Sequence, residues 1–174
     1  TRILDHINSS IRAQEMLIQK DHDQLIECCD PEKVLSDLYD GSFSFFPKYG
    51  AYNQIVSDGQ LSIIRNEEIR NKLTELYDYQ FTRYENIDAV VDHKFQYDFD
   101  EVFAGKMEFV YYNFKDSSKV VSSLNVEKYE AFFGELQAAT RSMYIITTDA
   151  KILLMEIQSS INEVLKSLQK ELDK

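Results

Sequence analysis

The side chains that could bind a metal ion are few and lie far apart in the sequence. The three histidines, His6, His22 and His93, each follow an aspartate. A zinc site would need His22 and His93 to meet across two helices beside a carboxylate such as Asp23 or Asp92. No two histidines have the spacing that supplies two ligands from one helix. We therefore predict no metal and no cofactor, and we expect the histidines to be solvated on polar faces.

The two cysteines, Cys28 and Cys29, are neighbours in the sequence. An ordinary disulfide joins residues whose Cα atoms are about 4.4–6.8 Å apart, a separation that adjacent residues do not reach without a strained backbone. Neighbours also lack the Cys-x-x-Cys spacing of a zinc or redox pair. We interpret them as two small residues at the end of a helix and expect no disulfide-stapled fold.

Motifs that would indicate catalysis are missing from the sequence. Asp98, Asp100 and Glu101 lie close together, but a calcium loop needs ligands at alternating positions around a central Gly, so we expect a solvated acidic face. The chain has neither a Gly-x-Ser-x-Gly elbow nor a Gly-rich phosphate loop. With 19 basic against 30 acidic residues, its net charge of −11 argues against nucleic-acid binding. The sequence predicts a protein that is not an enzyme.

Aromatic residues are abundant, with 11 Tyr and 11 Phe, and many of them fall in residues 43–52 and 95–114. Some must fill the core, because so many aromatic rings facing water would form a large apolar patch. Tyrosines with one polar end could instead line a small-molecule pocket or a partner surface. The candidate ligand-binding residues are Phe46, Tyr49, Tyr52, Tyr97, Tyr111 and Tyr112.

The elements that would position these residues are mostly helical in pattern. An apolar residue recurs every seventh position at Leu4, Ile11, Ile18 and Leu25, which predicts one helix of roughly 28 residues. Asp30 as N-cap and Pro31 at the first helical position then predict a short helix. It would stop at Gly41, and an aromatic loop would follow over residues 42–50.

A turn and a long helix are predicted next. The pattern gives a short helical piece over residues 51–57 that breaks at Asp58-Gly59. We expect the apolar residues that follow, Leu61, Ile63 and Ile64, to be buried. Asn66 is a helix cap with acidic residues in the next turn. The apolar spacing then continues to Gly105 without Pro or Gly, which predicts a helix about 60 Å long.

Two points in the second half stay open. Residues 109–112 could form a strand, a helical turn or a packed loop, because periodicity does not decide so short a run. Residues 126–172 keep one helical phase but contain Gly134 and the β-branched residues 145–148, so they could form one helix or two. We predict a single all-α domain over residues 1–174: an elongated antiparallel helical bundle with long helices and an aromatic capping loop.

Residues 57–81 carry a resemblance to a known family. They read Ser-Asp-Gly-Gln-Leu-Ser-Ile-Ile-Arg-Asn-Glu-Glu-Ile-Arg-Asn-Lys-Leu-Thr-Glu-Leu-Tyr-Asp-Tyr-Gln-Phe. This resembles a Bacteroidota family of unknown function, which has a serine-glycine turn, a Leu-x-x-Ile-Lys-Asn-like step and a helix ending in Leu-Tyr. Asp58 departs from the family, in which Ser and Gly are adjacent. The resemblance implies an N-terminal transmembrane anchor upstream of Thr1 and a helical domain on the periplasmic side of the inner membrane, and it supplies no catalytic residues.

Two functions are compatible with this sequence. The first is a non-enzymatic helical domain of a membrane-tethered envelope protein, acting in protein interaction or signal input through a protein partner or a homo-oligomer. The membrane would be reached only through the upstream anchor. The second is a small-molecule-binding sensor bundle whose pocket is lined by tyrosine and phenylalanine. An ordered ligand in an aromatic pocket would favour the second function.

Overall fold

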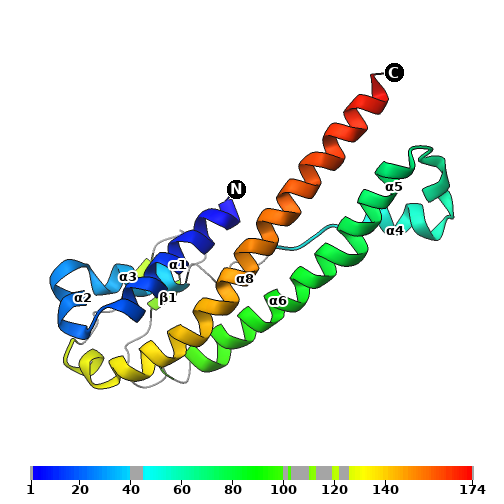
Figure 1. The fold of residues 1–174 in the computed structure, drawn as a ribbon. Helices are drawn as coiled ribbons and strands as arrows, with labels where there is room; N and C mark the ends of the chain where they lie inside the picture. Colours follow the sequence, from blue (N-terminus) through cyan, green and yellow to red (C-terminus); the bar gives the residue numbers. More distant parts are fainter. Residues whose placement is uncertain are drawn as a thin grey trace. The chain divides into compact units, whose positions relative to one another are not determined.

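The computed structural model describes residues 2–39, 45–99, 102, 110–112, 119–121 and 126–173. Helices dominate these residues, which confirms the predicted all-α class (Figure 1). The chain divides into two compact units, each built from two stretches of sequence. Unit 1 comprises Thr1–Phe43 and Val90–Thr148, and unit 2 comprises Ser44–Ala89 and Asp149–Lys174.

The first predicted helix is two helices, α1 (Arg2–Gln19) and α2 (His22–Cys28). The break lies at Asp21, whose carboxylate accepts a hydrogen bond from the backbone N–H of Gln24 at 2.8 Å. The Gln24 side chain in turn accepts from the backbone N–H of Asp21, which completes a capping box. The prediction of one continuous helix was wrong because this local cap begins a new helix inside the apolar repeat.

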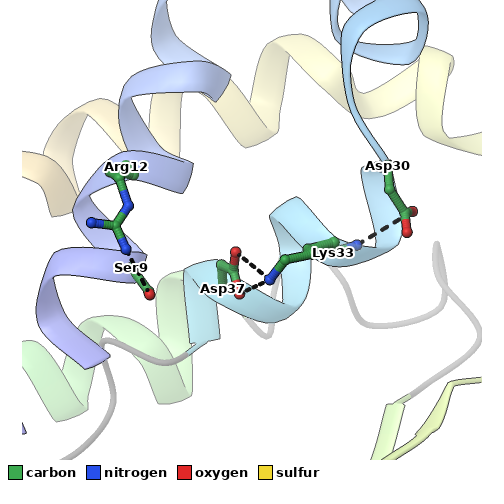
Figure 2. A network of polar contacts seen from close by, with 5 residues as sticks. All are labelled: Ser9, Arg12, Asp30, Lys33 and Asp37. Carbon is green, nitrogen blue, oxygen red and sulfur yellow. Dashed lines mark hydrogen bonds and ion pairs between the residues drawn. The ribbon is translucent and has the colours of Figure 1, made fainter. Parts of the chain in front are cut away.

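Helix α3 (Pro31–Tyr39) begins where the sequence predicts. Asp30 accepts a hydrogen bond from the backbone N–H of Lys33 at 3.4 Å, and the ammonium group of Lys33 pairs with Asp37 one turn later at 2.9 Å (Figure 2). On α1, Arg12 donates to the hydroxyl of Ser9 at 3.1 Å. The cap and the first helical proline are confirmed, whereas the predicted stop at Gly41 lies outside the described residues.

Residues 126–172, which the sequence left open as one helix or two, form one helix, α8 (Val126–Leu172). In unit 1 it runs antiparallel to α1, since later residues of α1 contact earlier residues of α8. Tyr144 donates to Glu15 at 2.9 Å, and Gln137 donates to the carbonyls of Leu17 and Lys20 at 2.8 and 2.9 Å. Gln137 thereby satisfies two of the carbonyl groups that the end of a helix leaves without a partner.

A buried polar network lies within the apolar core of unit 1. The Gln14 amide nitrogen donates to the hydroxyl oxygen of Ser10 at 3.0 Å and to that of Thr147 at 3.2 Å. The Ser10 hydroxyl donates to the carbonyl of Leu38 at 2.7 Å, and the Thr147 hydroxyl donates to that of Met143 at 3.0 Å. The network therefore joins α1, α3 and α8.

Unit 2 contains the predicted turn. Helix α4 (Gly50–Ser57) is followed by Gly59, whose φ of 66° is the left-handed conformation that glycine adopts freely. A 3-10 turn, η2 (Gln60–Ile63), then leads to α5 (Glu67–Thr74). Asn66 caps α5, because its side chain accepts from the backbone N–H groups of Glu68 and Ile69. The prediction that Ile63 is buried was wrong, since this side chain is 69% exposed.

The long helix predicted after Asn66 is helical throughout its described part but not uniform. Two π-helical turns, η3 (Glu75–Gln80) and η4 (Lys94–Phe99), lie before and after α6 (Phe81–His93). Each π turn contains one more residue between its hydrogen-bonded groups than a turn of α-helix does. In unit 2, Lys72 lies 3.4 Å from Glu163 and Asn66 donates to Glu171 at 3.2 Å. Helix α5 and the end of α8 are therefore antiparallel as well.

Two short strands answer part of the question about the structure of residues 109–112. Strand β1 (Val110–Tyr112) pairs antiparallel with β2 (Lys119–Val121), with Tyr111 opposite Val120. Of the three alternatives for residues 109–112, the strand is therefore the right one for 110–112. None of the described helices combines the length and apolar character needed to cross a bilayer.

Candidate functional site

The tyrosine cluster of unit 2 is the main candidate site. We use this name for Phe45, Tyr49, Tyr52, Tyr77, Phe81 and Tyr84. Tyr77, in the π turn η3, stacks on Tyr52 with ring centroids 4.4 Å apart and an interplanar angle of 11°. It also meets Phe81 edge-on at 5.0 Å and Tyr49 at 6.0 Å. Phe45 lies 5.7 Å from Phe81 and 5.8 Å from Tyr84.

Hydrogen bonding and burial give this cluster unusual acid–base properties. The Tyr49 hydroxyl donates to Glu85 Oε1 at 3.0 Å. Burial, reinforced by the hydrogen bond to Glu85 and its negative charge, raises the pKa of Tyr49 to about 12. Burial also raises the pKa of Tyr52, with Asp78 acting in the same direction. Both phenols stay protonated at neutral pH and can act there as hydrogen-bond donors.

We expect Tyr49 to ionise near pH 12 and the stability that it contributes to fall between about pH 10 and 12. The folded protein holds this proton more tightly than the unfolded chain, so the contribution is fully present below the ordinary phenol pKa and is lost as pH rises. The ultraviolet difference spectrum of phenolate formation, compared with Tyr49→Phe, measures the step. Glu85→Gln should lower the pKa. An unchanged pKa in that variant would show that Glu85 has no part in it.

The structure brings together only some of the predicted ligand-binding residues. Tyr49 and Tyr52 belong to the tyrosine cluster, whereas Phe46 is largely exposed. Tyr97 belongs to unit 1 and lies over His93, with ring centroids 4.6 Å apart. Tyr111 and Tyr112 form part of β1, and their side chains lie outside the described residues.

The sequence analysis missed the central residue of the cluster. The apolar spacing of the predicted long helix includes Tyr77 and Tyr84 but not Phe81, and it does not predict the contacts of these residues with Phe45 and Tyr49 before α4. The three- and four-residue steps between them were the available signal, because side chains at that spacing share one helix face.

Unit 2 also has a polar surface cavity of about 360 Å³, lined by Asn71, Lys72, Glu75, Ser160 and Glu163. Lys72 pairs with Glu68 at 3.0 Å, and this pair raises the pKa of Lys72 and lowers that of Glu68. The lining suits a polar or charged molecule and differs from the aromatic pocket that the sequence predicts.

The structure changes the interpretation of one histidine. His22 is only 15% exposed; its Nδ1 lies 3.1 Å from Asp23 Oδ1, and its ring meets Phe133 edge-on at 5.8 Å. The prediction of a solvated histidine was wrong here because the capped start of α2 turns His22 toward α8.

Asp98 pairs with Lys94 at 2.7 Å, while Asp100 and Glu101 lie outside the described residues.

The cysteine pair contradicts our expectation, because Cys28 and Cys29 form a disulfide. Helix α2 ends at Cys28, and Cys29 is extended with φ −145° and ψ 159°. Because Cys29 is extended, its side chain does not follow the direction that it would take in a continued helix. Its sulfur atom can therefore reach that of Cys28, although the two Cα atoms are only 3.8 Å apart. The helix-end position was predicted correctly, but the bond was not.

No protein-family model, curated protein or solved structure matches this chain. The resemblance of residues 57–81 to the Bacteroidota family therefore stays a prediction.

Proposed function

We propose that this chain is a non-enzymatic helical domain of a membrane-tethered envelope protein and acts in protein interaction or signal input. The observation that carries the proposal is the apolar turn, the segment 56–63 that runs from the end of α4 through η2. It exposes two large aliphatic side chains, Val56 at 47% and Ile63 at 69%. Exposed apolar groups are typical of partner-binding sites when they form a patch, and these two lie on either side of the turn at Gly59.

The apolar turn is held in one conformation by its own hydrogen bonds. The N–H of Gly59 donates to the carbonyl of Val56 at 3.1 Å, and the N–H of Ile64 donates to that of Leu61 at 3.3 Å. The Ser62 hydroxyl donates to the carbonyl of Gly59 at 3.4 Å. A preformed turn loses little conformational entropy when a partner binds, which favours affinity.

Polar residues lie between the two aliphatic residues in the sequence. Asp58, Gln60 and Ser62 are all exposed between Val56 and Ile63. Protein interfaces commonly combine apolar and polar groups. This arrangement supports a protein partner or a second copy of the chain as the occupant.

Two observations support the envelope location in this proposal. The Cys28–Cys29 disulfide fits an oxidising compartment, because disulfides are rare where thiols are kept reduced. The resemblance of residues 57–81 implies an upstream membrane anchor and a periplasmic domain.

Site-specific photo-crosslinking in the native host tests the interaction. We expect a photoreactive residue at Ile63 to give a discrete protein adduct and the same residue at Ile152, exposed on α8 in unit 2, to give none. Val56→Lys should suppress the adduct, because a charge on the same turn would have to lose its hydration at the interface. An adduct that Val56→Lys leaves unchanged, or none at Ile63, would contradict the proposal.

A small-molecule-binding sensor is the second candidate, and the polar cavity at Lys72 and Glu163 favours it. The rings of the tyrosine cluster pack on one another, which supports a structural role for them. A ligand that raises the melting temperature of the wild-type chain but not that of Glu75→Gln would favour this second function.

A further inference from the structure

We propose that the reduced chain binds one soft monovalent metal ion of the Cu(I) class through Cys28, Cys29 and Met16. All three residues belong to unit 1. The sequence predicts no metal, because its histidines do not supply two ligands from one helix and its cysteines lack the Cys-x-x-Cys spacing. The structure adds a possible ligand by placing the thioether of Met16 beside the cysteine pair.

The break between α1 and α2 creates this arrangement. Met16 lies in the last turn of α1, and Cys29 follows the end of α2. Because the chain restarts its helix at the Asp21 cap, Met16 Sδ comes to lie 3.8 Å from Cys29 Sγ. Cys28 Sγ lies 3.7 Å from the carbonyl oxygen of Leu25. Three sulfur atoms from residues 16, 28 and 29 therefore gather where the two helices end.

The distance between Met16 and Cys29 fits a shared metal ion. Two sulfur ligands that each lie about 2.3 Å from one ion are about 3.8 Å apart in tetrahedral geometry and about 4.0 Å apart in trigonal geometry. The observed 3.8 Å between Met16 Sδ and Cys29 Sγ lies at that spacing. Met16 Sδ and Cys29 Sγ thus lie at this spacing while the disulfide is intact, and its reduction frees Cys28 Sγ to move away from Cys29 Sγ and become the third ligand.

The ligand set selects a soft ion. Thiolate and thioether ligands favour Cu(I), whereas zinc takes its ligands from cysteine, histidine and carboxylate groups. Among the described residues, no three His, Cys, Asp or Glu side chains gather in a way that could hold a metal ion. The third donor next to the cysteine pair is a thioether, which is a soft ligand.

The site is accessible from solvent, because Cys28 is exposed and Cys29 and Met16 are half-buried. A dithiol reductant transfers two electrons and two protons to the disulfide, which becomes two thiols while the reductant becomes a disulfide. Binding of Cu(I) then displaces the thiol protons to solvent, because the thiolate is the metal ligand. Reoxidation of the pair removes both thiolates, so ion binding and the disulfide exclude each other.

A competition titration tests the proposal. The full chain is reduced with a dithiol, separated from it without oxygen, and titrated with Cu(I) against a coloured Cu(I) chelator. We expect one equivalent per reduced chain and none for the oxidised chain. Met16→Leu should weaken binding about 10-fold or more, since even supporting groups of metal sites contribute that much. Met155→Leu, an exposed methionine of unit 2, is the matched control and should bind like wild type.

Three results would overturn the proposal. They are a reduced chain that holds no Cu(I) against the chelator, Met16→Leu binding as tightly as wild type, and Zn²⁺ competing equally for the site. Cys28→Ser and Cys28→Ala should each abolish binding while keeping the helical circular dichroism spectrum. Wild-type affinity in either folded variant would also contradict the site.

Discussion

Gln14→Glu is expected to destabilise unit 1 by about 3–5 kcal/mol at neutral pH. The Ser10 and Thr147 hydroxyls both donate to backbone carbonyls, so their oxygens must accept from residue 14. The Gln14 amide supplies both N–H groups, whereas a carboxylate supplies none and adds an unpaired buried charge. Urea unfolding followed by circular dichroism measures the loss.

Gln14→Met is the matched control, because it keeps the volume and removes the polar group altogether. It should cost less than about 1.5 kcal/mol, because each buried hydrogen bond contributes little net stability. It also removes Gln14 Oε1, a buried acceptor that has no hydrogen-bond partner within the described part of the chain. Equal losses in the two variants would show that the buried charge adds nothing to the loss of the two N–H donors. The loss in Gln14→Glu should shrink in acid, where a protonated carboxyl regains one donor.

Ile157→Asp is expected to cost unit 2 about 3–5 kcal/mol of stability. Ile157 is only 2% exposed, so its replacement buries an unpaired charge and leaves a cavity in the core. Ile152→Asp is the matched control in the same helix and the same unit, because Ile152 is 50% exposed. We expect it to change stability by less than about 1 kcal/mol. A similar melting temperature for both variants would mean that the core face of α8 is assigned wrongly.

The helical class and most helix ends could be predicted because their signals are local. Asp30 with Pro31 starts α3, Gly59 turns the chain, and Asn66 caps α5. Each effect depends on a few neighbouring residues, which the sequence displays directly. The break at Asp21 had an equally local signal in Asp21 and Gln24, but the apolar repeat on either side masked it.

The features that escaped prediction depend on distant residues or on fine backbone geometry. The π turn at Tyr77 leaves the apolar spacing almost unchanged, so periodicity does not reveal it. Ser10, Gln14 and Thr147 look like surface residues in a hydropathy pattern, although all three are buried. Their burial becomes understandable only when α1 and α8 are placed side by side.

For the candidate site, composition identified Tyr49 and Tyr52 but not their partner Tyr77. The candidates of the second aromatic group, Tyr97, Tyr111 and Tyr112, belong to unit 1 instead. A count of aromatic residues finds apolar clusters, but it contains no information about which clusters meet. That information comes from the turn at Gly59, which brings α4 back toward the helix that carries Tyr77.

The pairing of Gln14 with Thr147, 133 residues later, has a consequence for biosynthesis. A ribosome adds about 5–20 residues per second, so α1 emerges roughly 7–27 seconds before its partner residues on α8. During that interval the apolar face around Leu17 has no α8 to cover it, although it is fully buried in the finished protein. The nascent chain should therefore be a substrate for chaperones that hold apolar segments until the last helix is made.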